Sequence, residues 1–309
     1  MFRFLLRRLV TIFFSLFFIV TLTFFMMKAI PGGPFTREKA LPPQIEQAIN
    51  EKFHLDDPLW KQYVDYLGRT ARWDLGPSFK YQYKTVNDII SDYFPVSAQL
   101  GATAILLALV VGLSAGTISA LKQNQIQDYG TMFLAILCFS VPSFVIAGLL
   151  QYLFAYRWQI LPPAMWGSWK HMVMPVLSLA ALPTAVIARL MRSGMLEVLQ
   201  QDYVKTARAK GLSSSKIITK HVIRNAILPV VTYMGPLIAG ILTGSFIIEH
   251  IFAVPGLGRS FVTSIQNRDY TVVMGTTVFY SLFLMGMNLI VDMAYAFIDP
   301  RIKLADRKE

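Results

Sequence analysis

Charge and cysteine are both scarce in this chain. Of its 309 residues only 15% are charged, whereas soluble proteins carry about 25%, and 54% are hydrophobic. This shortage of charge indicates a membrane protein. Cys138 is the only cysteine, which excludes an internal disulfide and a cysteine metal cluster.

Sequence patterns of enzymes are missing as well. The chain has no H-E-x-x-H, and its four histidines are scattered without metal-ligand spacing. Ser213 to Lys216 match S-x-x-K by letter, but they lie in a polar segment beside a predicted helix start, where capping explains the serines. We therefore expect no catalytic residue, no metal and no cofactor bound by this chain.

Six apolar segments are long enough to cross a bilayer, which takes roughly 20 residues. They are Leu9–Ile30, Val96–Leu121, Tyr129–Tyr156, Met172–Leu190, Pro229–Ile251 and Val272–Ile298. The first is too long for a signal-peptide core and is followed by Pro31-Gly32-Gly33-Pro34 rather than a cleavage site, so we interpret it as a retained helix. The predicted fold class is all-α, with six transmembrane helices.

Positive charge predicts the orientation. An even number of spans puts both termini on one side, together with segments 122–128 and 189–228, and this side is rich in Lys and Arg. The short loops opposite, 157–171 and 252–271, hold only Arg157, Lys170, Arg259 and Arg268. Both termini are therefore predicted to be cytoplasmic. Topology and membrane lipid account for the net charge of +11, and no nucleic-acid partner is needed.

The chain divides into three predicted parts: residues 1–30, an extracytoplasmic helical segment at 31–95, and a five-helix membrane core at 96–309. Three short helices are expected in the extracytoplasmic segment. The first runs from Pro42 through Phe53, the second is capped by Asp57 before Pro58, and the third is capped by Thr85 and ends near Ile90. The segment forms either a cap on the membrane core or a docking surface for an outside partner.

A long cytoplasmic loop at 192–228 is the most patterned part of the core. Asp202 is placed to cap a short helix through Lys210, and Gly211 to end it in the left-handed conformation. Ser213 to Ser215 open a second helix that runs into the fifth span. The alternative is an ordinary basic loop held near anionic lipid.

Several short motifs together resemble the permease subunits of binding-protein-dependent ATP-driven importers of the peptide and nickel class, in particular the first permease of oligopeptide importers. These motifs are Phe4-Leu5-Leu6-Arg7-Arg8-Leu9, Pro31-Gly32-Gly33-Pro34-Phe35, Leu41-Pro42-Pro43, His54-Leu55-Asp56-Asp57-Pro58, Leu75-Gly76-Pro77-Ser78-Phe79-Lys80-Tyr81, Val86-Asn87-Asp88, Thr206-Ala207-Arg208-Ala209-Lys210-Gly211, Gly244-Ser245 with Glu249, Pro255-Gly256-Leu257-Gly258, Arg268-Asp269-Tyr270 and Asp299-Pro300-Arg301. In the cytoplasmic signature, Ala207 and Gly211 match directly, whereas the signature's glutamate falls on Lys205.

The resemblance implies a type I ABC importer permease in the bacterial cytoplasmic membrane. A second permease would complete the pathway, two ATPase subunits would bind ATP and Mg²⁺, and an extracytoplasmic binding protein would deliver oligopeptides. The chain itself has no G-x-x-x-x-G-K-[ST] phosphate loop. The expected ATPase-coupling residues are Asp202, Tyr203, Val204, Thr206, Ala207, Arg208, Ala209, Lys210 and Gly211. Dipeptides, nickel or another small solute are the alternative cargo, and a gradient-driven channel or transporter is the alternative class.

Two acids lie in or near predicted spans, Glu249 and Asp292. Intramembrane acids are costly and are candidates for function, but we favour a structural role for both. Asp292, placed deep in the sixth span, is expected to pair with the second permease or within the bundle. Gly112 and Gly116 have the spacing that allows close helix packing.

Overall fold

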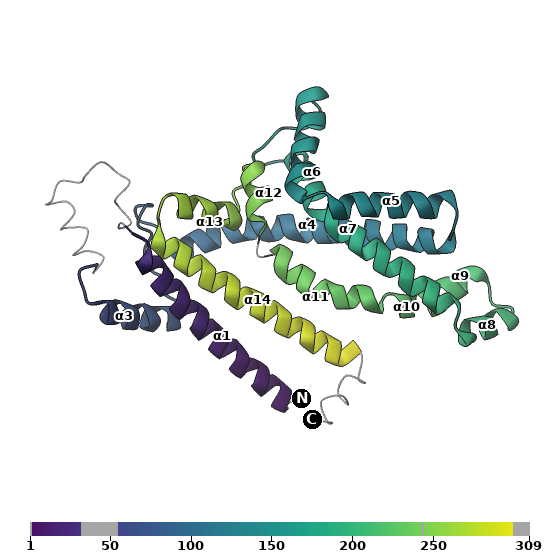
Figure 1. Ribbon diagram of the computed structural model, residues 1–309, viewed down its shortest axis with the longest axis horizontal. Coiled ribbons are helices and arrows are strands. Elements are labelled where there is room, and N and C mark those ends of the chain that lie inside the picture. The colour runs from purple at the N-terminus through teal and green to yellow at the C-terminus, as the bar shows by residue number, and fades with distance from the viewer. Residues whose placement is uncertain (1, 32–54, 243, 299–309) are drawn as a thin grey trace.

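The computed structural model describes residues 2–31, 55–242 and 244–298. These residues form helices joined by short connections, without a named strand, as expected for an all-α membrane protein (Figure 1). Five described helices are long and apolar enough to cross a membrane, and a sharply bent helix pair makes a sixth candidate. The predicted fold class is therefore confirmed.

Helices α4 (Val86–Leu121) and α7 (Trp169–Leu199) form the most extensive helix contact of the described chain. Glycines allow this contact. A methyl group on Gly116 would lie 2.4 Å from the carbonyl oxygen of Ala188, and one on Gly112 would lie 2.8 Å from Ile187 Cβ. The predicted packing role of this glycine pair is confirmed, because any side chain would push the two helices apart.

The third span is not one straight helix. Helix α5 (Ile126–Ser140) is followed, after a bend of 105°, by α6 (Ser143–Leu150), which continues directly as the π-helix η1 (Gln151–Arg157). Figure 1 shows α5 beside α7 and α6 turning away from the direction of α5. Pro142 causes the break, because it has no N–H to donate and it holds Val141 in an extended conformation (φ −91°, ψ 122°).

The fourth and fifth spans also differ from their predicted bounds. Helix α7 continues to Leu199, so Arg189 and Arg192 lie in this helix rather than in a loop. The fifth span divides into α11 (Leu228–Leu242) and the short α12 (Phe246–Ile251), and Gly244 between them has φ +97°. A further helix, α13 (Leu257–Gln266), forms in the following loop, where none was predicted.

Helices α1 (Phe2–Ala29) and α14 (Tyr270–Ile298) pack side by side and run in opposite directions (Figure 1). The start of α1 therefore lies at the same end of this pair as the end of α14, which agrees with termini on one side of the membrane. Most of α1 is exposed and apolar, as a lipid-facing or partner-facing helix requires.

The extracytoplasmic segment packs on the membrane helices as a cap. Helix α3 (Leu59–Ala71) lies against α1, where Tyr66 stacks on Phe24 at 5.6 Å between ring centres and the Tyr63 hydroxyl is 2.7 Å from Thr21 Oγ1. Burial raises the pKa of Tyr66 to about 12. The described part thus packs on α1, as the cap interpretation requires, and a docking surface for an outside partner stays a prediction. The helix expected at 42–53 lies outside the described residues.

Two predicted helix starts in this segment need correction. Pro58, not Asp57, is the N-cap of α3, and the Asp57 carboxylate instead forms an ion pair with Lys61 at 3.0 Å. Thr85 does cap a helix, but that helix is α4 rather than a short one. It passes through Pro95 without a break, so the extracytoplasmic segment and the second span share one helix.

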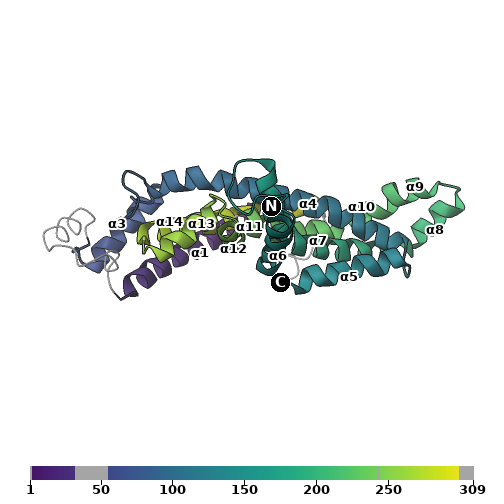
Figure 2. The same cartoon turned by 90° about the horizontal axis from the view of Figure 1, so that it is seen from above.

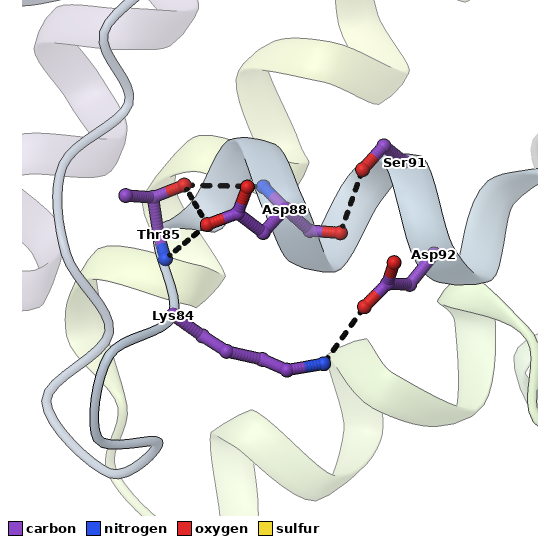
Figure 3. Close-up of polar contacts among 5 residues, drawn as sticks. All are labelled: Lys84, Thr85, Asp88, Ser91 and Asp92. Carbon is purple, nitrogen blue, oxygen red and sulfur yellow. Dashed lines mark hydrogen bonds and ion pairs between the residues drawn. The ribbon is translucent and has the colours of Figure 1, made fainter.

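The capping of α4 is reciprocal (Figure 3). The Asp88 N–H donates to Thr85 Oγ1 at 3.1 Å, and the Thr85 N–H donates to the Asp88 carboxylate at 2.9 Å. Lys84 reaches past this turn to Asp92 at 2.7 Å, and this hydrogen bond raises the pKa of the Lys84 ammonium. Two of the otherwise unpaired groups at the start of α4 are thereby satisfied.

The glycine contact between α4 and α7 predicts the effect of a single added methyl group. We expect Gly116→Ala to lower the stability of the purified protein by about 1–3 kcal/mol, because the helices must separate. Thermal unfolding in detergent measures this. Gly130→Ala in α5 is the matched control, since nothing lies within 4 Å of its new methyl group. Equal stability of the two variants would contradict the role of Gly116.

Candidate functional site

Helix α8 (Asp202–Ala209) is the predicted coupling helix, and it follows α7 after a two-residue turn. Figure 2 places α8 at the opposite end of the molecule from α3. Gln201, not Asp202, is the N-cap, so the predicted cap is off by one residue. Asp202 still lies in the first turn, where its negative charge suits the helix dipole, and it pairs with Lys205 at 2.8 Å on the exposed surface.

Two small apolar side chains hold α8 to the rest of the protein. Val204 is completely buried and Ala207 is 6% exposed. Both belong to the large core cluster that includes Met195 of α7 and Val222 of η2 (Ile218–Val222). The remaining predicted coupling residues are exposed: Asp202, Tyr203, Thr206, Arg208, Ala209, Lys210 and Gly211. Helix α8 thus has an anchored apolar face and a free polar face.

Gly211 ends the helix as predicted. Its φ is +73°, in the left-handed region that glycine adopts without strain. The Gly211 N–H donates to Arg208 O at 2.9 Å, and the Leu212 N–H donates to Ala207 O at 3.3 Å. These two bonds close the last turn and satisfy carbonyl groups that a helix end otherwise leaves unpaired.

The second cytoplasmic helix is present but broken. It consists of α9 (Ser214–Ile217), η2 and α10 (Ile223–Ala226), which lead to α11. Asn225 Nδ2 donates to the Tyr203 hydroxyl at 3.0 Å, which ties this segment back to α8. Helix α8 is therefore attached both to α7 and to the segment that leads into α11.

A buried ion pair that the sequence did not predict fixes the cytoplasmic end of the core. Arg192 of α7 donates two hydrogen bonds to Asp128 of α5, at 2.6 and 2.8 Å. The hydroxyl of Ser119 in α4 and the N–H of Asn124 also donate to this carboxylate, which is 2% exposed. Together, Asp128, Arg192 and Ser119 join α4, α5 and α7 near the end of α7 that leads to α8. The sequence alone did not show that Arg192 and Asp128 pair, because the two residues are far apart along the chain.

Glu249 of α12 is completely buried and joins three segments. Its carboxylate accepts from Ser97 Oγ of α4 at 2.8 Å and from the N–H of Arg259 at 3.0 Å. Ser97 Oγ in turn accepts from the Leu257 N–H at 2.9 Å. The carboxylate therefore accepts a hydrogen bond from an N–H group at the start of α13 that would otherwise be unpaired, and it holds this helix against α4. Both contacts are structural.

Gly244, Gly256 and Gly258 lie against the Glu249 carboxylate, and a side chain at any of these positions would collide with it. A methyl group on Gly256 would lie 2.3 Å from Glu249 Oε2, and methyl groups on Gly244 and Gly258 would also lie within 3 Å of a carboxylate oxygen. Motifs that are separate in the sequence therefore form one site. The sequence identified its members but not their common contact with Ser97.

Asp269 is a third buried carboxylate, 1% exposed, and it connects the extracytoplasmic segment to α14. It accepts from the N–H groups of Phe79 and Lys80 at 3.1 and 3.3 Å and from the Ser78 hydroxyl. It also accepts from Thr271 Oγ1 at 3.0 Å. Asp269 was quoted only as part of a motif, and the structure shows that this motif contacts the one at 75–81.

Asp292 is not deep in the bundle. It forms an ion pair with Arg8 of α1 at 2.5 Å, near the start of that helix. Thr11, Ser15 and Asn288 line a small cavity of about 110 Å³ beside the pair. Asp292 therefore has a partner within the chain, and a partner on the second permease stays a prediction. Among the described residues, no group of three His, Cys, Asp or Glu side chains could hold a metal ion.

The structural role of Glu249 gives a prediction that separates stability from transport. We expect Glu249→Ala to destabilise the protein by roughly 2–4 kcal/mol, because it leaves buried donors unpaired and a cavity beside them. Glu249→Gln keeps one carbonyl acceptor and should be milder. Thermal unfolding and transport per folded complex are the measurements. A Gln variant with normal stability but no transport would contradict the structural role.

Two family profiles match this chain. The family profile described as "Binding-protein-dependent transport system inner membrane component" matches residues 108–304, and the profile of the N-terminal part of such membrane components matches residues 1–101. An amino acid ABC transporter crystallised with histidines has a TM-score of 0.55 and 16% identity, covering 67% of this chain and 92% of that one. At this identity the likeness supports the fold alone.

Relatives at much higher identity cover nearly the whole chain. The dipeptide transport system permease protein DppB of Bacillus subtilis is 50% identical over 98% of both chains. The oligopeptide transport system permease protein OppB of Salmonella typhimurium is 47% identical over 98% of this chain and all of its own. The profile match and these two relatives show that the chain belongs to the family of binding-protein-dependent transport system inner membrane components, as an ABC permease of the OppB and DppB type.

Proposed function

We propose that this chain forms half of the translocation pathway of an ATP-driven peptide importer that works by alternating access. Helix α8 is the observation that carries the proposal. Its apolar face is anchored by Val204 and Ala207, and its other residues are free to contact a partner. A short, well-closed helix of this kind suits docking into an ATPase subunit.

The partners follow from what the chain lacks. It has no phosphate-binding loop, so two ATPase subunits would bind ATP and Mg²⁺ and supply the energy. A second, different permease would complete the pathway, and a binding protein would deliver cargo to the extracytoplasmic side. The link from α8 to both α7 and α11 would carry ATP-dependent motion into the membrane core.

The proposed cargo is oligopeptides, and dipeptides are the second candidate. Both are favoured by the names of the relatives, an oligopeptide permease at 47% identity and a dipeptide permease at 50%. This small difference in identity does not separate the two. The two cargo classes differ in length, which a direct uptake assay resolves.

Uptake in cells that lack this chain tests the function. We expect labelled tripeptides to pentapeptides to enter only when the intact gene is restored, and uptake to stop when ATP is depleted with the ion gradient held. Paralogous importers must be deleted in the same strain. Uptake of dipeptides alone would select the second candidate, and uptake that survives ATP depletion would overturn the ATP-driven mechanism.

The end of α8 provides a test of coupling. We expect Gly211→Asp to uncouple or dissociate the ATPase, because it combines left-handed strain with a negative charge at the docking edge. Gly211→Asn is the matched control, since Asn tolerates this conformation and adds no charge. Co-purification of the ATPase and transport-dependent ATP hydrolysis are measured. Full activity of the Asp variant would contradict the assignment of α8.

A further inference from the structure

Helices α1 and α14 enclose a cavity of about 110 Å³ beside the ion pair between Arg8 and Asp292. Thr11 and Ser15 line this cavity from α1, and Asn288 lines it from α14. The rest of the lining is apolar. The cavity therefore offers both signs of charge, two hydroxyls and an amide to a molecule that enters between the first and the last span.

The lengths of the two helices place the ion pair at the cytoplasmic edge of the membrane. Helix α1 is uncharged from Leu9 to Met27, which is about 28 Å of helix, and α14 is uncharged from Tyr270 to Val291, about 33 Å. Both lengths match a hydrocarbon core of about 30 Å. Arg8 directly precedes the first stretch and Asp292 directly follows the second, so both charges lie where the lipid headgroups begin.

Two polar side chains that lie deeper in the cavity, Ser15 and Asn288, have no hydrogen-bond partner among the described residues. Along the helix axes, Asn288 lies about 6 Å from Asp292 towards the membrane centre, and Ser15 lies about 10 Å from Arg8 in the same direction. An amide or hydroxyl without a partner is costly in hydrocarbon. A ligand of this cavity must therefore be polar over this depth, and not only at the ion pair.

These positions match the polar part of a zwitterionic phospholipid. A guanidinium has five N–H donors, so it can bind a phosphate while it stays paired with a carboxylate. An ammonium group beside that phosphate suits the Asp292 carboxylate. The glycerol ester carbonyls of such a lipid lie below its phosphate, towards the acyl chains, where Asn288 and Ser15 can donate hydrogen bonds to them. Basic pockets between membrane helices on the cytoplasmic side are a known kind of lipid headgroup site.

A small anion from solution fits the cavity less well. It would meet the negative charge of Asp292 beside Arg8, and it would leave the deeper amide and hydroxyl without a partner. The surroundings also suit a lipid, because most of α1 is exposed and apolar and the acyl chains could continue along it.

We propose that this cavity binds a phospholipid of the cytoplasmic leaflet whose headgroup carries an ammonium beside its phosphate. Arg8 holds the phosphate, Asp292 holds the ammonium, and Asn288 and Ser15 hold the glycerol esters. Among the described helices, α1 packs mainly on α14 and α3, so a lipid bound here strengthens the attachment of the first span to the last. The inference goes beyond the proposed transport function and does not depend on the cargo.

Photochemical labelling in a membrane tests the site. The full-length protein, with any subunits that co-purify, is reconstituted in liposomes containing a trace of phosphatidylethanolamine with a photoreactive group at the top of one acyl chain. We expect adducts on Ile12 and Leu289, which line the cavity, and peptide mass spectrometry maps them. Arg8→Gln should lower this labelling about tenfold and Asn288→Leu about fivefold. Asn288→Leu leaves the ion pair intact, so it tests the site even if the Arg8 variant fails to fold.

Arg7→Gln is the matched control, because it removes the same charge one residue away and Arg7 does not line the cavity. Its labelling should equal that of the wild type. Equal labelling of the Arg7 and Arg8 variants would overturn the proposal, as would adducts spread evenly along the exposed face of α1, which ordinary boundary lipid would give.

Two further probes separate the ligand classes. Equal labelling by a phosphatidylglycerol probe, which has no ammonium, would overturn the assignment of a zwitterionic headgroup. Loss of labelling in excess inorganic phosphate would assign the cavity to an anion from solution instead. The measurement uses neither peptide nor ATP, so its outcome is independent of whether the protein imports peptides.

Discussion

The close approach of α4 and α7 is the contact on which the rest of the structure depends. In lipid, helices gain little from the hydrophobic effect, and their association comes from close packing and hydrogen bonds. Gly112 and Gly116 bring the two backbones together. Helices α5, α6, α10 and α11 then pack on α7, and α8 follows directly from it. The position of α8 therefore depends on the contact between α4 and α7.

Buried carboxylates hold the ends of these helices. Asp128, Glu249 and Asp269 each accept hydrogen bonds from a backbone N–H and a hydroxyl. Each also has a partner far away in the sequence: Arg192, Ser97 and Phe79, respectively. An unpaired acid at such depth would cost several kcal/mol, and the helix starts would leave their own donors unpaired. When the carboxylate accepts hydrogen bonds from these N–H groups, both the acid and the donors are paired. We infer that these acids determine where the connections between spans lie, rather than taking part in transport.

Features set by local chemistry could be predicted from the sequence. The spans, the cap at Thr85 and the left-handed Gly211 depend on residues within one or two turns. The spacing of Gly112 and Gly116 is equally local, although the helix that packs on them is distant in the sequence. Features set by distant contacts could not. The direction taken after Pro142 and the partners of Asp128 depend on which helices lie nearby, and a single sequence does not contain this information. Local chemistry was not always sufficient. Asp57 and Asp202 are better N-cap formers than their neighbours, yet the N-caps in the structure are Pro58 and Gln201.

Helix α7 connects the membrane core to the surface proposed for the ATPase. Arg192, which pairs with Asp128 of α5, and the end of α7 at Leu199 are separated by seven residues of unbroken helix, or about 10 Å. Helix α8 begins after a further two-residue turn. A displacement of α8 by the proposed ATPase would therefore reach α7 directly and α5 through this ion pair.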